Sequence, residues 1–234
     1  MPKLKNIAII PARGGSKRII GKNIKDFLGK PIIAYSIEAA IDSKIFDEVI
    51  VSTDDSQIAT VAQKYGANVP FYRSEKNADD FATLSDVVEE VVQEYKNQDI
   101  EFQSLCCILP TAPFISVKNL QSSYEKLQVE SFDTIFPVLQ FSFPIQRCLQ
   151  IKNDKVSMVW QEHLNTRSQD LPARYHDAGQ FYWCNTKAFL KSKKLYTENS
   201  GAIVISQLEA QDIDTEIDWK LAELKYKVLN EISE

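Results

Sequence analysis

Residues 7–18 read IAIIPARGGSKR, an apolar run that passes directly into a loop with two glycines and several cations. The apolar run predicts a buried first strand over residues 5–10. Adjacent glycines let backbone N–H groups approach an anion closely, and basic side chains neutralise its charge. The basic residues of this region are Arg13, Lys17, Arg18 and Lys22. The stretch therefore predicts a strand that ends in a phosphate-binding loop.

The glycine pattern by itself does not specify a ligand. It matches neither G-x-G-x-x-G, the dinucleotide-binding pattern, nor G-x-x-x-x-G-K-[ST], the Walker loop. Solvated cations around a Gly-Gly turn are common in α/β proteins, so an ordinary surface turn remains an alternative at this point.

Short β-branched runs alternate with helical patterns through the first half of the chain. This alternation is typical of βαβ units and predicts an α/β fold with a mostly parallel sheet flanked by helices. Pro31, Gly66 and the pair Thr83 and Asp86 mark helix ends. The predicted strands are 5–10, 48–52, 68–71, 104–109 and 134–139, and the predicted helices are 32–41, 56–65, 83–98 and 117–130.

The pattern changes in the second half. Residues 147–151 and 156–160 read as an antiparallel hairpin around the turn 152–155. The stretch 161–179 is polar and too long for a simple connection, which indicates a functional loop. The remaining predicted elements are a strand at 181–184, a helix at 187–191, a strand at 201–205 and an amphipathic helix that ends near residue 232, with Asp214 or Thr215 as its N-cap.

Composition limits the possible functions. With 234 residues, 44% hydrophobic and 25% charged, the chain resembles an ordinary globular protein. It shows no signal peptide and no apolar run near the roughly 20 residues that span a bilayer, so we expect a cytoplasmic protein without a membrane partner. A net charge of −5 with scattered cations argues against nucleic-acid binding.

The thiols and imidazoles are few. The four cysteines lack C-x-x-C spacing and read as small apolar residues in a reducing compartment, and two histidines disfavour a zinc site. The cysteines are Cys106, Cys107, Cys148 and Cys184.

Asp212 and Asp214 form a second informative pair. In an extended segment their side chains point to the same side while Ile213 points to the other. Two carboxylates with water and phosphate oxygens are a typical Mg²⁺ ligand set. The alternative is that Asp214 only caps the last helix and Asp212 is solvated.

Other polar residues are candidates for ligand contacts. Arg73 follows the predicted strand 68–71, at the sheet edge where α/β folds bind ligands, and its guanidinium could contact a base edge; the alternative is an exposed arginine paired with an acid. Further along, cations with few matching acids suit a carboxylated, polyhydroxylated substrate, although a solvated or intersubunit loop is equally compatible. These residues are Arg147, Arg167, Gln169, Arg174 and His176.

Taken together, the motifs resemble the cytidylyltransferases that activate nonulosonic acids, the group containing CMP-sialic acid synthetase. The resemblance spans nearly the whole chain. The matching motifs, in order, are ARGGSK at 12–17, KN at 22–23, GKP at 29–31, VSTD at 51–54, LPTAP at 109–113 and DIDTE at 212–216.

The resemblance implies a Rossmann-like fold in a single nucleotidyltransferase domain over 1–234. Within it, 140–180 would form a protruding hairpin with a substrate and dimerisation loop that exchanges with a second subunit. It also implies CTP and a nonulosonic acid as substrates, Mg²⁺ as cofactor and a homodimer.

The resemblance also implies roles for individual residues. The implied catalytic residues are Arg13, Lys22, Asp212 and Asp214, of which Asp212 and Asp214 hold the metal. The implied nucleotide-binding residues are Ala12, Arg13, Gly14, Gly15, Ser16, Lys22, Asn23, Arg73 and Asp80. The implied sugar-binding residues are Arg147, Arg167, Gln169, His176 and Asp177.

Two departures concern the sugar. Leu109 stands where sialic-acid enzymes have Gln, and His176 stands where they have Arg in the sugar loop. The segments 162–171 and 175–179 look more like the branch that activates pseudaminic acid, so we expect CMP-pseudaminic acid synthesis, with legionaminic or sialic acid as alternatives. Rival readings are another nucleotidyltransferase, a glycosyltransferase, or a non-catalytic nucleotide-binding protein.

Overall fold

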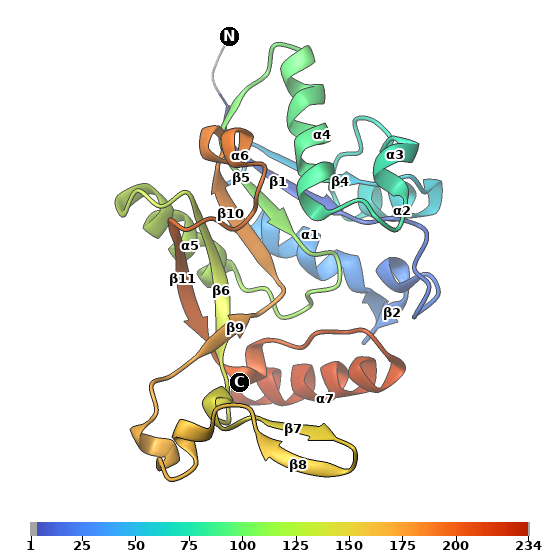
Figure 1. Ribbon diagram of the computed structural model, residues 1–234. Coiled ribbons are helices and arrows are strands. Elements are labelled where there is room, and N and C mark those ends of the chain that lie inside the picture. The colour runs from blue at the N-terminus through green and yellow to red at the C-terminus, as the bar shows by residue number, and fades with distance from the viewer. Residues whose placement is uncertain (1–3, 234) are drawn as a thin grey trace.

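The computed structural model describes residues 4–233, whose centre is a mixed, mostly parallel sheet with the strand order β11-β6-β10-β5-β1-β4 and with β9 paired to β6 (Figure 1). Only β9 and β10 run antiparallel to the other strands of this sheet. Ile9 lies opposite Ile50 of β4 and Cys107 of β5, which fixes the register at the centre. The strands are β1 (Leu4–Pro11), β4 (Glu48–Ser52), β5 (Phe102–Ile108), β6 (Thr134–Gln140), β9 (Tyr175–Asp177), β10 (Phe181–Asn185) and β11 (Ser200–Ile205).

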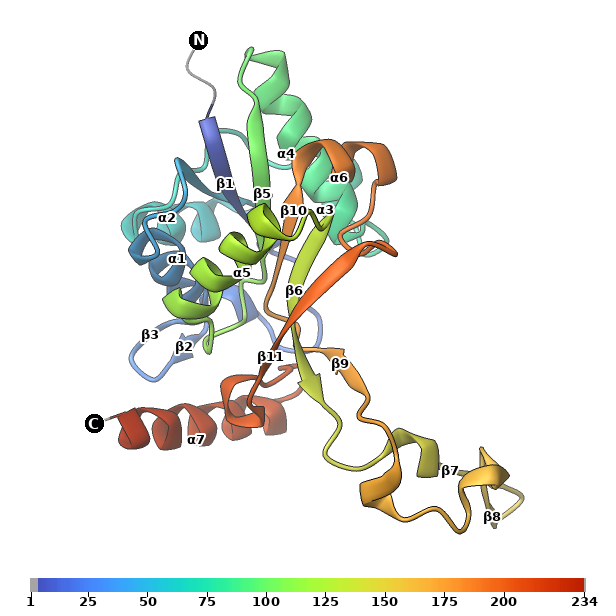
Figure 2. The same cartoon turned by 90° about the vertical axis from the view of Figure 1, so that its left-hand side faces the viewer.

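Helices cover both faces of the sheet because successive strand residues point to opposite sides. Ala8 and Ile10 belong to one core cluster, under α1, α2 and α5, whereas Ile7 and Ile9 belong to the other, under α4 and α6 (Figure 2). The helices are α1 (Ile32–Asp42), α2 (Ser56–Lys64), α4 (Leu84–Asn97), α5 (Val117–Val129) and α6 (Thr186–Ser192).

A third core cluster attaches the C-terminal helix α7 (Glu216–Ser233) near the carboxyl ends of the parallel strands. Phe27 lies in the short strand β2 (Asp26–Phe27), which pairs with β3 (Lys30–Pro31). Its ring contacts that of Trp219 in α7 edge-on, with 5.6 Å between ring centroids. Ile213, just before α7, is buried in the same cluster.

The segment between β6 and β9 projects from the rest of the molecule and is called the arm, residues 141–174 (Figure 2). It contains the hairpin β7 (Leu149–Lys152) and β8 (Lys155–Met158), as the sequence predicts. Three short 3₁₀ helices accompany it: η2 (Ile145–Arg147), η3 (Gln161–His163) and η4 (Ser168–Asp170).

The structure corrects several sequence-based expectations. The strand predicted at 68–71 is wrong: only a single bridge joins Asn68 to Ile50, and Pro70 has no N–H to extend the pairing. The sequence did not predict the short helix α3 (Glu75–Ala78) or β9 within the polar stretch. Arg147, predicted as the start of the hairpin, lies in η2.

The other predicted helices and strands are confirmed, with ends shifted by a few residues at most. The capping pair Thr83 and Asp86 is present at α4. Of residues 4–233, none form a helix long and apolar enough to cross a membrane.

Candidate functional site

A cleft of about 290 Å³ lies at the carboxyl ends of β1, β4 and β5, the edge at which open α/β sheets bind ligands. Its walls come from the loop after β1, from η1 (Lys22–Ile24), from the segment 73–84 and from the loop after β5. The residues that line it are Pro11, Arg13, Ser16, Lys22, Asn23, Arg73, Asn77, Asp79, Asp80, Ala82, Thr83, Leu84, Val87 and Thr111.

The glycine loop is held against the loop after β4. The backbone N–H of Gly14 donates to Asp54 Oδ1 at 3.0 Å. A Cβ on Gly14 would lie 2.6 Å from Asp55 Oδ2, whereas a Cβ on Gly15 would meet nothing within 4 Å. The buried Asn23 donates from Nδ2 to the carbonyl of Arg13 at 2.9 Å. Glycine is thus required at position 14 for close packing, and the loop is fixed from two sides.

The cations of the loop contact acids on the opposite wall. Arg13 Nη1 lies 3.0 Å from Asp80 Oδ1 and donates to the carbonyl of Asp79 at 2.6 Å. Lys17 forms an ion pair with Asp80, and this hydrogen bond lowers the pKa of the Asp80 carboxyl. Asp80 therefore holds Arg13 and Lys17 at the wall of the cleft, where it was expected to contribute to nucleotide binding.

The structure brings Asp214, which is distant in sequence, beside Lys22 at the edge of the cleft. Asp214 Oδ2 lies 2.5 Å from Arg18 Nη1, and Asp214 Oδ1 lies 3.9 Å from Lys22 Nζ. The Lys22 side chain is only 17% exposed. Burial lowers the pKa of Lys22, and the charges of Asp214 and Asp212 oppose that effect. Lys22 is the point at which the glycine loop and the aspartate pair meet.

The cap of α7 leaves the Asp214 carboxylate available. Thr215 N and Oγ1 donate to Asp218 Oδ2 at 2.7 and 2.8 Å, and Asp218 N donates to Thr215 Oγ1 at 3.3 Å. Those bonds lower the pKa of Asp218. Of the two expected N-caps, Thr215 is the one observed, so the reading of Asp214 as only a cap is wrong.

The donor set of the aspartate pair fits a hard divalent cation. Ile213 is buried between Asp212 and Asp214, and both carboxylates are at least partly exposed. No group of three or more His, Cys, Asp or Glu side chains suited to a metal occurs among residues 4–233. Two carboxylates suit Mg²⁺, which commonly takes its remaining ligands from water and substrate phosphates.

Arg73 lines the cleft and is not the exposed, acid-paired arginine of the alternative reading. It is 8% exposed, and its guanidinium donates from Nε to Ser52 Oγ at 3.1 Å and from Nη2 to the Ser52 carbonyl. Its own N–H donates to the carbonyl of Thr53 at 2.9 Å, which ties it to the end of β4. Burial lowers the pKa of Arg73.

The predicted sugar residues do not line the cleft of their own chain. Arg167 and Gln169 are exposed in the arm, where Arg167 Nε pairs with Asp170 Oδ2 at 2.7 Å and Arg147 donates to Ser168 Oγ at 3.4 Å. Arg174, at the arm's end, is also exposed.

His176 and Asp177 lie in β9, where the arm joins the sheet. His176 Nδ1 lies 2.9 Å from the Asp177 carbonyl, and the Asp177 carboxylate accepts hydrogen bonds from Tyr182 Oη and from the Gly179 N–H, each at 2.7 Å. Burial and the charge of Asp177 raise the pKa of Tyr182.

Sequence reasoning missed several residues at this edge. Asn77 and Thr111 line the cleft, and Asp54 fixes the glycine loop. Asp54 and Thr111 lie shortly after parallel strands, a position that the sequence shows but that does not single out these residues. Asn77 lies in α3 and has no such signal.

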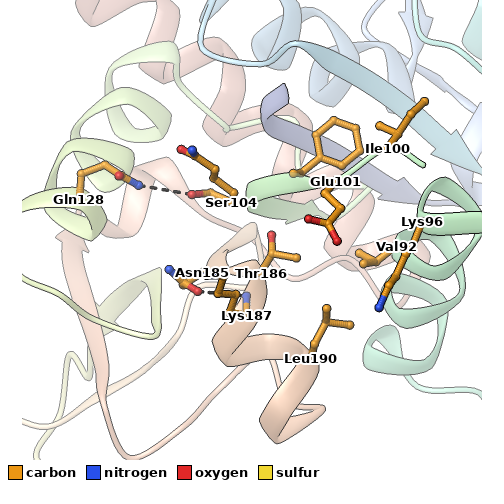
Figure 3. A pocket seen from close by; sticks show the side chains of 12 residues that line it. Val92, Lys96, Ile100, Glu101, Ser104, Gln128, Asn185, Thr186, Lys187 and Leu190 are labelled. Carbon is orange, nitrogen blue, oxygen red and sulfur yellow. Dashed lines mark hydrogen bonds between the residues drawn. The ribbon is translucent and has the colours of Figure 1, made fainter. Parts of the chain in front are cut away.

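A second cavity, of about 330 Å³, lies between α4, the start of β5 and α6 (Figure 3). Its wall includes Ser104, whose hydroxyl accepts a hydrogen bond from Gln128 Nε2 at 3.3 Å. This cavity is at the amino end of β5, opposite the edge that carries the glycine loop and the aspartates, so it is not the candidate active site.

The chain is similar to known cytidylyltransferases over almost its full length. A family model described as cytidylyltransferase matches residues 7–231. Pseudaminic acid cytidylyltransferase of Campylobacter jejuni is 43% identical over 229 residues, covering 97% of this chain and 99% of that protein. CMP-N,N'-diacetyllegionaminic acid synthase of Legionella pneumophila is 34% identical, covering 93% and 94%.

A solved structure agrees on the fold. CMP:2-keto-3-deoxy-manno-octonic acid synthetase, determined as a complex with CTP, matches with a TM-score of 0.69 at 17% identity. The match covers 97% of this chain and 99% of that chain, so the two share the architecture of the central sheet and its helices.

Proposed function

The chain belongs to the cytidylyltransferase family, and from this premise we propose that it couples CTP to pseudaminic acid and releases pyrophosphate. The observation that carries the proposal is the meeting of the glycine loop with the aspartate pair at Lys22. A nucleotide-binding protein without catalysis needs the loop but not the two carboxylates. The 43% identity to a pseudaminic acid cytidylyltransferase favours that sugar.

In the proposed reaction the anomeric hydroxyl of the sugar attacks the α-phosphorus of CTP. The bond from that phosphorus to the bridging oxygen breaks, pyrophosphate leaves with the oxygen, and the hydroxyl proton is released. Arg13, Lys22 and the glycine loop at residues 14–16 hold the triphosphate, so that positioning and charge neutralisation supply most of the acceleration. Mg²⁺ bound by Asp212 and Asp214 would neutralise phosphate charge.

Arg73 is proposed to contact the cytosine. Ser52 engages its Nε and Nη2, which holds the planar group at the wall of the cleft with its remaining donor, Nη1, free of these bonds. A rigid guanidinium is suited to contact the edge of a base with little loss of side-chain entropy.

We also propose a homodimer in which each arm supplies Arg147, Arg167 and Gln169 to the partner's cleft. Two apolar surfaces support it: exposed side chains of the arm, and a stripe along one face of α7. The arm side chains are Leu149, Ile151, Val156, Val159, Trp160 and Leu164, and the stripe is Ile217, Leu221, Leu224 and Val228. The partner of these surfaces is a second copy of this chain.

The four cysteines are free, three of them buried, which suits the proposed action in the reducing cytoplasm.

Pyrophosphate release tests the proposed function. The purified protein is incubated with CTP, Mg²⁺ and, separately, pseudaminic, legionaminic, sialic and 3-deoxy-octulosonic acids. We expect the highest kcat/KM with pseudaminic acid and little reaction when UTP replaces CTP. A higher kcat/KM with legionaminic acid would replace pseudaminic acid as the assigned sugar; a synthase of the legionaminic acid type is 34% identical to this chain. If CTP binds but no pyrophosphate is released with any of the sugars, the protein is a non-catalytic nucleotide binder. A glycosyltransferase would also release no pyrophosphate from CTP.

A further inference from the structure

The segment that carries the aspartate pair has little regular structure of its own. Between β11 and α7 the only element is η5 (Gln207–Glu209), and residues 210–214 lie in neither helix nor strand. Repeated backbone hydrogen bonds therefore do not fix the positions of Asp212 and Asp214. Side chains from other elements have to fix them.

Two anchors hold the front of this segment. Glu209 caps η5 by accepting from the Ser206 N–H at 2.9 Å, and Gln180 donates from Nε2 to the carbonyl of Glu209. Ala210 and Ile213 are buried, at 2% and 1% exposure. Apolar burial fixes the depth of the segment but leaves the orientation of its carbonyls to hydrogen bonds.

Lys225 provides those bonds from the middle of α7. Its Nζ donates to the carbonyl of Gln207 and to the carbonyl of Ala210, each at 3.0 Å. An ammonium group has three donors and bridges two carbonyls readily. The side chain is half-buried, and its bond to the Ala210 carbonyl is partly shielded from water. Ala210 precedes Asp212 by two residues, so this bond holds the backbone close to the carboxylates.

We propose that Lys225 is a positioning residue that fixes the Asp212–Asp214 segment against α7, so that both carboxylates face the metal. The inference rests on the proposed function for the identity of the site. Without Lys225 the carbonyls of Gln207 and Ala210 lose this partner. The front of the segment is then left with the Gln180 bond to the Glu209 carbonyl and the burial of Ala210 and Ile213.

The test compares Lys225→Met with Lys227→Met, a matched loss of an exposed lysine on the same helix. Lys225→Arg, whose fork again presents two donors, tests rescue, and Lys225→Gln is the second variant if Lys225→Met does not fold. Three measurements are made: amide hydrogen exchange of residues 206–214, Mn²⁺ binding with CTP present and sugar absent, and the Mg²⁺ dependence of pyrophosphate release.

For Lys225→Met we expect faster exchange in 206–214 and about tenfold weaker Mn²⁺ binding, the range seen when groups behind metal ligands are removed. The Mg²⁺ concentration for half-maximal rate should rise similarly, while kcat at saturating Mg²⁺ and KM for CTP change much less. Lys225→Arg should restore most of the Mn²⁺ affinity.

Equal Mn²⁺ binding by Lys225→Met and Lys227→Met would overturn the proposal, even if exchange differs, because Lys225 would then be only structural. Exchange and Mn²⁺ binding need no sugar, so they decide this inference even if the panel of sugars yields no product. Absence of product with intact Mn²⁺ and CTP binding would count against the proposed function alone.

Discussion

At the scale of single residues, the neighbours Asp214 and Thr215 have different tasks. Thr215 caps α7, whereas the Asp214 carboxylate contacts Arg18 and Lys22. Asp214→Ala should lower kcat at least about 100-fold with little change in melting temperature. Thr215→Ala should lower the free energy of unfolding by about 1 kcal/mol and change kcat little. Steady-state kinetics and thermal melts measure both; a normal rate for Asp214→Ala in saturating Mg²⁺ would refute the metal assignment.

The protonation of Lys22 predicts that CTP binding is coupled to proton uptake. Burial lowers its pKa in the free protein, and the anionic triphosphate of CTP should raise it again. A base whose pKa rises on binding takes up protons at a pH between its free and bound values, so CTP binding in alkaline buffer should take up protons. Calorimetry in two buffers of different ionisation enthalpy measures the uptake. Lys22→Arg, which stays charged, should abolish it; equal uptake by both proteins would assign it to another group.

The sequence indicated the residues of the glycine loop and the aspartate pair but not the residues that they contact. The alternation of Asp212, Ile213 and Asp214 predicts two carboxylates on one side with Ile213 turned to the core, and Ile213 is buried as expected. Whether Asp214 or Thr215 caps α7 depended on hydrogen-bond geometry to Asp218, because both residue types are good caps. Contacts such as Gly14 with Asp54 join loops distant in sequence, and no local pattern encodes them.

At the scale of elements, the loop after β1 has less room for a side chain at Gly14 than at Gly15. Gly14→Ala would place a Cβ 2.6 Å from Asp55 Oδ2, so either the glycine loop or the Asp55 side chain, which caps α2, must shift. We expect KM for CTP to rise about tenfold or more, because small displacements of binding groups are costly. Gly15→Ala, with open space around its Cβ, is the control. Equal effects of the two substitutions would mean that contact with CTP, and not packing on Asp55, limits the loop.

Elements with local signals were predictable, and those defined by distant pairing were not. Helix-end residues, such as Pro31, Gly66 and Thr83, and apolar periodicity indicated the long helices. In contrast, β9 exists because it pairs with β6 across the base of the arm, and its polar sequence gives no strand signal. The segment 68–71 shows the opposite case. Its sequence is typical of a strand, but only one position, Asn68, pairs with the sheet.

At the scale of the whole molecule, the arm projects from the rest of the chain (Figure 2), and its residues Arg147, Arg167 and Gln169 do not line the cleft of the same chain. If arms exchange, a site consists of one subunit's cleft and its partner's arm. Arg167→Ala and Asp214→Ala should each be nearly inactive alone, yet co-expressed they should recover about one quarter of wild-type activity, since half of the dimers are mixed and one of two sites in each is intact. No recovery in dimers proven mixed would place the arm and cleft of one chain in the same site.

The central claim is that CTP gives its α-phosphate to the sugar at this cleft. The direct measurement uses CTP labelled at the α- or the γ-phosphate, with Mg²⁺ and pseudaminic acid. Our account predicts that the α-label moves into a CMP-sugar and the γ-label into pyrophosphate, in equal amounts, only when sugar is present, and that Asp214→Ala abolishes both transfers. Pyrophosphate release without sugar, or a γ-label in the sugar product, would contradict it.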